Sequence, residues 1–144
     1  VGALSVVGTD KDEAVRVLSQ VKRVVRTNYS NPPTHGGQIV AQVLADVELR
    51  ALWEAELGMM RDRIKLMRAA LVERLHERMR GRDFRYMLAQ RGMFSYSGRT
   101  KPQVHRMREE YSIYAVDTGR ICVAALNSKN VGYVAEAMAA VMQA

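Results

Sequence analysis

One long amphipathic pattern limits the folds open to this chain more than any other feature. From about Val47 to Met79, apolar residues recur in steps of three and four, namely Trp53, Leu57, Met60, Ile64, Met67, Leu71 and Leu75. This spacing predicts a single helix with a continuous apolar stripe that faces a core. At 1.5 Å per residue the helix would be about 45 Å long, more than the width of a small domain. We therefore expect it to belong to two domains at once.

The segment before this helix predicts a strand and two shorter helices. Residues 1–9, VGALSVVGT, form an apolar run rich in β-branched residues, which is typical of a buried strand. Thr9 or Asp10 can then cap a helix, which should end near residues 26–29 because SNPP follows. HGGQIVAQVLAD predicts the second helix. Since a chain that starts inside a buried strand, without methionine, looks cut, we expect it to be a piece of a longer polypeptide.

After the long helix, the apolar period shortens from that of a helix to that of a strand. DFRYML and GMFSYSG alternate apolar and polar residues, so residues 83–88 and 92–98 are predicted to be half-buried strands. Thr100 and Pro102 are typical of a helix start, and this helix should run to Tyr111.

The final stretch predicts two more strands and a helix. SIYAVDTGRICVAAL indicates two short strands joined by a turn at residues 117–119. Asn127 should cap a last helix, whose apolar face would hold Val131, Val134, Ala135, Met138 and Val141. The order of elements predicts an α/β fold, in which one strand and three helices precede a small α+β part.

Composition argues against several functional classes. No apolar run approaches the length of a membrane span. The single cysteine, Cys122, cannot form an internal disulfide, which fits a reducing compartment. In its apolar run we expect Cys122 to be a buried small hydrophobe rather than a nucleophile. His35, His76 and His105 lack the spacing of metal ligands, so no metal site is expected.

The net charge of +7 raises the question of an anionic partner. The stretch RDRIKLMRAALVERLHERMRGR, however, mixes its arginines with Asp62, Glu73 and Glu77. Aromatic platforms and base-reading motifs, which nucleic-acid-binding surfaces usually add, are absent from the sequence. We therefore expect no nucleic-acid partner and keep a non-catalytic basic module, binding nucleic acid or a protein, as the alternative function.

Two arginines occupy positions suited to binding a carboxylate. Arg120 follows a glycine turn and precedes ICVAAL, so a buried strand would hold its planar fork rigidly. Arg26 ends a helix just before the proline-stiffened loop. Each has a simpler alternative: Arg120 is a strand-end arginine in water, and Arg26 is a cation that complements the helix dipole.

Three further residues are weaker candidates. Tyr29 and Ser30 can donate hydrogen bonds from the proline loop, although loop hydroxyls usually bond the local backbone. Phe94 can either wall a pocket or fill the small core. These patterns alone describe a helix-rich α/β chain with candidate carboxylate-binding arginines, and no reaction follows from them.

Taken together, the segments resemble a known family. RTNYSNPPTHGG, GMFSYSG and REEYSIYAVDTGRICVAALN stand in the order seen in the C-terminal third of bacterial aspartate/aromatic aminotransferases, of pyridoxal-phosphate-dependent fold type I. VGALSVV, LWEAELGMMRDRI and the terminal helix extend the resemblance over nearly the whole chain. It implies that residues 1–60 are the C-terminal part of the large cofactor-binding and dimerisation domain. Residues 61–144 would be the α+β small domain, linked by the long helix of about 47–79.

The resemblance also implies roles for four residues. Arg120 matches the arginine that binds the α-carboxylate of the substrate, and Phe94 matches a residue on the small-domain side of the pocket. Arg26 matches the arginine that receives the distal carboxylate of aspartate or glutamate in the neighbouring subunit's active site, and that swings away for an aromatic side chain. Ser30 matches a serine that reaches across the dimer interface to the cofactor side.

The implied protein is a cytoplasmic homodimer that exchanges an amino group between an L-amino acid and a 2-oxo acid. The amino acid would be aspartate, glutamate or an aromatic one, the cofactor pyridoxal phosphate, and no metal, membrane or nucleic acid would take part. In the family, the lysine that binds the cofactor lies upstream of the matched segments. None of the lysines here matches it, so this chain alone should be inactive; they are Lys11, Lys22, Lys65, Lys101 and Lys129.

Overall fold

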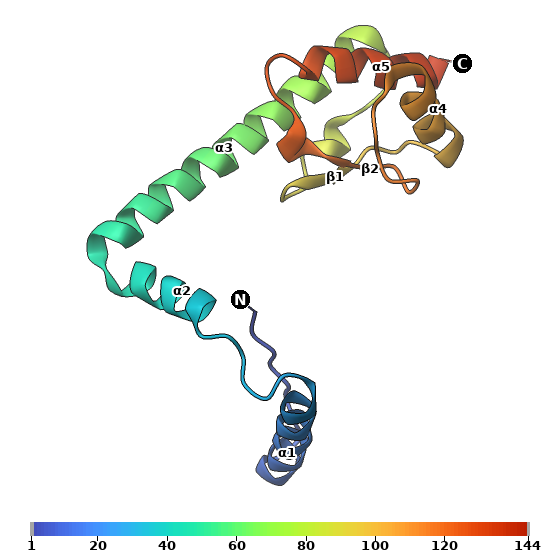
Figure 1. Ribbon diagram of the computed structural model, residues 1–144. Coiled ribbons are helices and arrows are strands. Elements are labelled where there is room, and N and C mark those ends of the chain that lie inside the picture. The colour runs from blue at the N-terminus through green and yellow to red at the C-terminus, as the bar shows by residue number, and fades with distance from the viewer. Residues whose placement is uncertain (1, 144) are drawn as a thin grey trace. The chain divides into compact units, whose positions relative to one another are not determined.

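The computed structural model describes residues 2–143, and Val1 and Ala144 lie outside them. The chain gathers into two units, one up to Glu54 and the other from Ala55. One helix, α3 (Val47–Arg78), runs through this boundary without interruption (Figure 1). The prediction of a single long helix is therefore confirmed. No helix of the described residues is both long and apolar enough to cross a lipid bilayer.

The first unit contains α1 (Lys11–Asn28) and α2 (His35–Ala45) before the start of α3. Asp10 caps α1 as predicted, because its Oδ1 accepts a hydrogen bond from the N–H of Glu13 at 2.7 Å. Thr9 donates from its hydroxyl and its N–H to the carboxylate of Glu13, at 2.7 and 2.6 Å. These bonds lower the pKa of Glu13 and fix the first turn.

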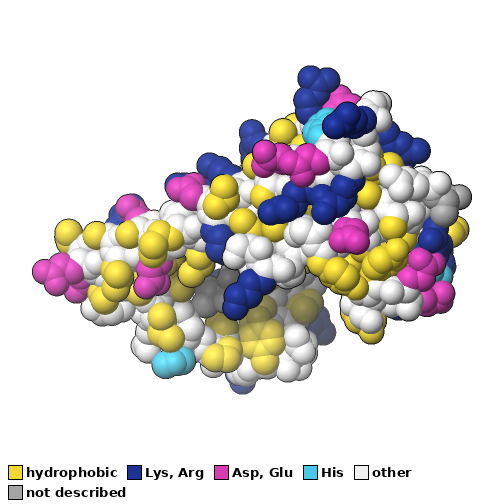
Figure 2. All heavy atoms as spheres, turned by 90° about the horizontal axis from the view of Figure 1, so that it is seen from above, with side chains coloured by type: hydrophobic (Ala, Val, Ile, Leu, Met, Phe, Trp, Pro, Cys, Tyr) yellow, Lys and Arg dark blue, Asp and Glu magenta, His cyan; other side chains and the backbone are white. Residues whose placement is uncertain are grey.

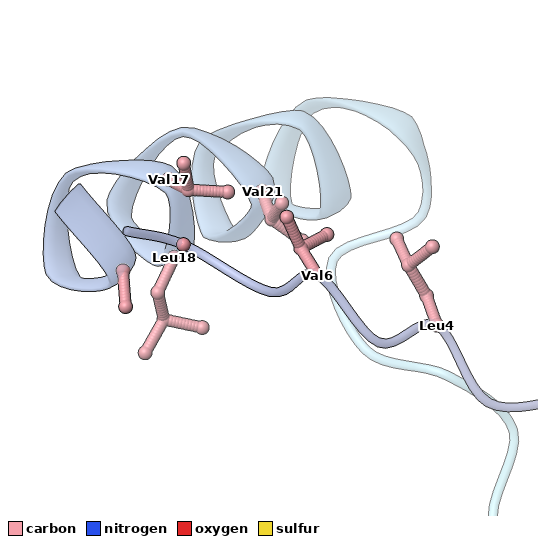
Figure 3. A pocket seen from close by; sticks show the side chains of 7 residues that line it. Leu4, Val6, Val17, Leu18 and Val21 are labelled. Atoms are coloured by element: carbon pink, nitrogen blue, oxygen red, sulfur yellow. The ribbon is translucent and has the colours of Figure 1, made fainter. Parts of the chain in front are cut away.

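The strand predicted over residues 1–9 is wrong for the part that the structure describes. Residues 2–8 have no regular secondary structure, and Leu4 and Val7 are 79% and 96% exposed. A strand needs a neighbour to pair its N–H and C=O groups, and no strand of the described residues pairs with this segment. Instead the segment lies along α1, and the hollow between them is lined by Leu4, Val6, Val17, Leu18 and Val21 (Figure 3).

The apolar stripe of α3 is buried only toward its C-terminal end. Its members from Met67 onward exclude solvent, and Ile64 is partly buried against the same core. Those from Trp53 to Met60 are about half exposed. The prediction of a continuous buried stripe is wrong for the first half of the helix, because the elements of the core cover α3 only from about Ile64 onward.

The second unit surrounds one apolar core. The C-terminal half of α3, α4 (Lys101–Tyr111) and α5 (Val131–Gln143) gather on one side of two short strands, β1 (Phe94–Tyr96) and β2 (Arg120–Cys122) (Figure 1). Fully buried at the centre are Leu71, Leu75, Met87, Met107, Val123 and Met138. The prediction of mixed helices and strands in this part is confirmed.

Local hydrogen bonds set the starts of both short helices in this unit. Thr100 and Gln103 form a reciprocal capping box at α4, as Thr100 predicts. Asn127 acts one turn before α5: its Oδ1 accepts from the N–H groups of Lys129 and Asn130, at 2.9 and 3.1 Å. Asn127 therefore caps the turn that leads into α5 rather than the helix itself.

The strand predicted over residues 83–88 is wrong, because a single helical turn, η1 (Arg85–Met87), takes its place. The guanidinium and the N–H of Arg85 bond the carboxylate of Asp83 at 2.9 and 2.8 Å. These bonds lower the pKa of Asp83 to about 2. A side chain that bonds the neighbouring backbone in this way competes with strand pairing.

Of the two strands predicted over residues 112–126, only β2 is formed. The turn between them is present, since the N–H of Gly119 donates to the carbonyl of Val116 at 2.8 Å. Residues 112–116 nevertheless have no strand structure, and β2 pairs antiparallel with β1 instead. After β2 the chain forms another single turn, η2 (Val123–Ala125).

The expectation that Cys122 is buried is also wrong. On β2 only Ile121 points into the core, and Arg120 and Cys122 are exposed on the other face. A sheet with helices on one side buries every second residue of each strand. The apolar character of ICVAAL therefore does not bury all of its members.

Candidate functional site

The outward face of the two-stranded sheet carries the candidates predicted in the second unit. Each strand buries its middle residue and exposes the other two, so Phe94, Tyr96, Arg120 and Cys122 face outward. In the strand register Tyr96 lies directly opposite Arg120, and Phe94 lies opposite Cys122 and hence diagonal to Arg120. The sheet thus brings one arginine together with two aromatic residues.

Arg120 and Phe94 are in contact. The guanidinium carbon of Arg120 lies 5.0 Å from the centre of the Phe94 ring, a cation–π distance. No carboxylate of the described residues forms an ion pair with Arg120. Its N–H fork is therefore open to a carboxylate from outside the chain. Arg120 is also exposed, as an ordinary strand-end arginine in water would be. Its candidate role therefore rests on its contact with Phe94 and on having no ion pair with a described residue, and not on burial.

The turn before Arg120 depends on a glycine. Gly119 has a φ of +83°, in the region where other residues are strained. A Cβ at this position would lie 2.6 Å from the carbonyl oxygen of Arg99 and 3.2 Å from its nitrogen. The backbone of Gly119 therefore approaches the backbone of Arg99 more closely than any side chain permits.

Asp117 ties the same turn to α4. Its carboxylate lies 3.2 Å from Nζ of Lys101, 3.3 Å from Nε2 of His105 and 3.6 Å from a guanidinium nitrogen of Arg108. The hydrogen bond from Lys101 is the main cause that lowers the pKa of Asp117. Three basic groups on one face of α4 thus hold the carboxylate that stands three residues before Arg120.

The sequence held a signal for this cluster that was missed. Lys101, His105 and Arg108 follow one another at steps of four and three, so they share one face of the predicted helix. An acidic residue in a nearby turn is a natural partner for such a face. Only the packing of the turn on α4 identifies that residue as Asp117.

In the first unit, the structure brings Arg26 and Ser30 together. Arg26 lies in the last turn of α1, and its Nη1 donates a hydrogen bond to the hydroxyl of Ser30. Ser30 has a φ of +66°, unusual for a residue with a side chain, and its N–H bonds the carbonyl of Val25 at 3.0 Å. The position of Arg26 also suits the simpler role of complementing the helix dipole. Tyr29 is exposed and makes no side-chain bond among the described residues.

Two buried arginines were not found from the sequence. Arg68 and Arg99 are 4% and 2% exposed, and each donates to one carbonyl: Arg68 to Gly92 at 2.6 Å and Arg99 to Ser97 at 2.8 Å. Nε of both residues and Nη2 of Arg99 have no partner in the described part of the chain. Desolvation lowers the pKa of Arg99 to about 10.

The residues that the structure describes do not by themselves fit pyridoxal phosphate. A lysine that forms an imine with a cofactor needs desolvated surroundings, whereas every lysine here is exposed: Lys11, Lys22, Lys65, Lys101 and Lys129. The hydroxyl of Ser30, the predicted cofactor-side group, accepts a bond from Arg26 and keeps its own O–H to donate, but it is a single group. No cluster of His, Cys, Asp and Glu among the described residues could hold a metal ion. Arg120, which forms no ion pair with a described residue, is suited instead to binding a carboxylate.

Known proteins are similar to this chain over nearly its whole length. The family model for class I and II aminotransferases matches residues 1–138. The aspartate aminotransferase of Pseudomonas aeruginosa is 61% identical over 142 residues, which are 99% of this chain and 36% of that protein. The chain therefore spans about a third of the length of such relatives.

Solved structures give the same result for the fold. An aromatic-amino-acid aminotransferase from Burkholderia pseudomallei, covalently bound to pyridoxal phosphate, has a TM-score of 0.83 and 67% identity, over 94% of this chain and 34% of that one. An aromatic amino acid aminotransferase from Psychrobacter sp. B6, cocrystallised with aspartic acid, has a TM-score of 0.85 and 46% identity, over 96% and 35% of the two chains. This chain thus adopts part of the α/β fold of pyridoxal-phosphate-dependent enzymes of fold type I.

Proposed function

The chain belongs to the family of class I and II aminotransferases, and from this we propose that the full-length protein transfers an amino group between an L-amino acid and a 2-oxo acid. The amino acid is aspartate, glutamate or an aromatic one. Relatives named for aspartate and for aromatic amino acids support both classes. The proposed cofactor is pyridoxal phosphate, which serves as an electron sink for the substrate when it is bound. The proposed location is the cytoplasm.

The observation that carries this proposal is the open guanidinium of Arg120 against the ring of Phe94. Amino acids and 2-oxo acids share an α-carboxylate, and a planar fork binds such a group through two parallel hydrogen bonds. Phe94 supports one side of the guanidinium, which limits the directions that the arginine can take. Arg120 is the proposed α-carboxylate group of the site, and Phe94 forms part of its wall.

Arg26 is the proposed second carboxylate group, acting in the active site of the neighbouring subunit of a homodimer. The bond to Ser30 holds its guanidinium at the end of α1, just before the stiff proline loop. Ser30 is proposed to lie on the cofactor side of the same shared site. An aromatic substrate lacks the distal carboxylate, so for it Arg26 would turn away.

Two separated arginines do more than raise affinity. Each charge-assisted pair is stronger than a neutral hydrogen bond, and together they fix both ends of a dicarboxylic substrate. A substrate held at both ends presents its α-carbon in one orientation, which lowers the entropic part of the barrier. In this proposal, the chain contributes to catalysis by holding the substrate in one orientation.

The alternative, a non-catalytic basic module, finds less support. On the face that Figure 2 shows, acidic side chains lie among the basic ones. Several arginines are paired with neighbouring acids, as in Arg50–Glu54, Asp83–Arg85 and Arg106–Glu110. A surface that tracks phosphates needs cations without such partners.

The test uses the full-length protein with pyridoxal phosphate. Arg120→Leu should lower kcat/KM by about 100-fold or more for aspartate and for phenylalanine alike, because both carry the α-carboxylate. As the control, Arg80→Leu removes an exposed arginine without a proposed role. Its kcat/KM should stay within about twofold of the parent value for both substrates. Unchanged turnover in Arg120→Leu would disprove the assigned role.

Arg26→Leu separates the two substrate classes. It should lower kcat/KM for aspartate by about 100-fold and for phenylalanine by less than about tenfold, because only aspartate has a distal carboxylate. The matched control is Arg23→Leu, an exposed arginine one turn earlier on α1. Equal losses with both substrates would contradict the assignment of Arg26.

A further inference from the structure

A buried hydrogen-bond network lies directly behind Arg120, and Ser97 is at its centre. Ser97 is 0% exposed. Its N–H and its hydroxyl both donate to the carbonyl oxygen of Gly119, at 2.9 and 2.7 Å. That carbonyl belongs to the peptide unit whose nitrogen is that of Arg120. Two hydrogen bonds from one residue therefore fix the peptide from which Arg120 extends.

Ser97 is itself held from the other side. Its carbonyl oxygen accepts the hydroxyl of Tyr86 at 2.7 Å and Nη1 of Arg99 at 2.8 Å. The Tyr86 hydroxyl also lies where a side chain on Gly98 would stand, 2.8 Å from the place of its Cβ. The network is thus closely packed around Ser97, and the serine cannot shift without breaking several bonds.

From this network we infer that Ser97 is a positioning residue for Arg120: it sets the direction in which the guanidinium leaves β2, and so the fit to a substrate carboxylate. The inference rests on the proposed function of Arg120. A tilt of the peptide before Arg120 moves the far end of the long side chain more than the backbone. Displacement of a bidentate group by about 1 Å is enough to weaken binding substantially.

The strand β1, which ends just before Ser97, offers a matched control. Ser95 is 2% exposed, two residues before Ser97, and its hydroxyl donates to Oε1 of Gln90 at 2.8 Å rather than to Gly119. Alanine at either position removes one buried hydroxyl and one hydrogen bond. The two variants should therefore lose similar thermal stability, while only the change at Ser97 loosens the peptide before Arg120.

The experiment measures steady-state kinetics of the full-length enzyme with aspartate. Ser97→Ala should raise KM about tenfold and change kcat by less than about threefold, the size expected for one lost hydrogen bond that acts through orientation. Ser95→Ala should keep KM within about twofold. Equal KM values in the two variants would overturn the inference, because the serine would then serve stability alone.

A double-mutant cycle completes the test. If Ser97 acts through Arg120, adding Ser97→Ala to Arg120→Leu should cost less than about twofold more in kcat/KM. The same tenfold loss in both backgrounds would overturn the positioning role. Failure of the proposed function is recognised separately, because Arg120→Leu alone would then leave kcat/KM unchanged.

Discussion

At the scale of single residues, Arg99 is the least expected feature of the molecule. It is a buried cation with one hydrogen bond, two orphan nitrogens and no carboxylate partner in the described residues. The ring of Phe84 lies 5.9 Å from its guanidinium and offers only a weak substitute. Burial of an unpaired charge lowers the free energy of unfolding. Replacing such a residue with an apolar side chain of similar length often raises that free energy.

Arg99→Met should therefore raise the free energy of unfolding by about 1–3 kcal/mol at neutral pH. The cost of burying the charge is present at neutral pH, because Arg99 is still charged with its pKa lowered to about 10. The lost bond to Ser97 matters less, since Tyr86 continues to bond that carbonyl. Urea unfolding measures the change against Arg80→Met, an exposed arginine with the same loss of charge. If Arg99→Met is less stable than Arg80→Met, the hydrogen bond lost from Arg99 contributes more to stability than the burial of its charge costs.

At the scale of elements, short-range signals predicted the helices and the strands β1 and β2. They failed for the other predicted strands, which are the described part of residues 1–9 and residues 83–88 and 112–116. The cap at Asp10 and the box at Thr100 depend on residues within one turn, so the sequence alone locates them. The partner of β2 depends on how distant segments pack, and the pattern suggested the wrong neighbour. Cys122 was misjudged for the same reason: alternation shows which residues share a face, but not which face is covered.

The candidate site likewise has residues that the sequence predicts and contacts that only the structure shows. Arg120 and Arg26 were found through resemblance and charge, and the sequence placed both at the ends of elements. The contact of Arg120 with Phe94 joins residues on different strands, and the bonds from Ser97 to Gly119 join the residue after β1 to the residue before β2. No period or motif encodes such contacts, so only the folded chain shows them.

Asp117 gives a prediction at this scale, since it links the turn before β2 to α4. Its pKa is lower in the folded protein than the ordinary 3.8, so its ionised form stabilises the fold. That contribution is complete above the unfolded value and is lost as pH falls through the folded value. Asp117→Asn should therefore be less stable than the parent at pH 7, and the difference should be smaller at pH 3, which lies below the ordinary value.

Urea unfolding at both pH values measures this, and 1 M salt should shrink the difference as well because the groups are exposed. Glu110→Gln is the control: its partner, Arg106, lies on the same helix, so no link between elements is lost. A difference between Asp117→Asn and the parent that is as large at pH 3 as at pH 7 would exclude an electrostatic link.

At the scale of the whole molecule, the two units differ in how much core they contain. α1 and α2 have no buried residues, whereas the second unit encloses a core built from α3, α4, α5 and the loops between them. Buried apolar contacts are what make a helix costly to open. The 144-residue chain should therefore show two levels of local stability.

Hydrogen exchange tests this directly. In the 144-residue chain, amides at the buried centre of α5, around Met138, should exchange at least about 100-fold more slowly than those in the middle of α1, around Leu18. Mass spectrometry of peptides from the two helices measures both. Equal protection in α1 and α5 would mean that the exposed apolar residues of α1 are covered in solution.

The close approach at Gly119 also has a use in enzyme engineering. For the proposed activity, a library intended to change which amino acid is accepted can vary Phe94 and Tyr96, because both side chains face outward beside Arg120 and neither is part of the buried core. Every replacement of Gly119 instead meets the backbone of Arg99. Screening effort at that position would be wasted, and it is best left constant while the two aromatic positions are varied together.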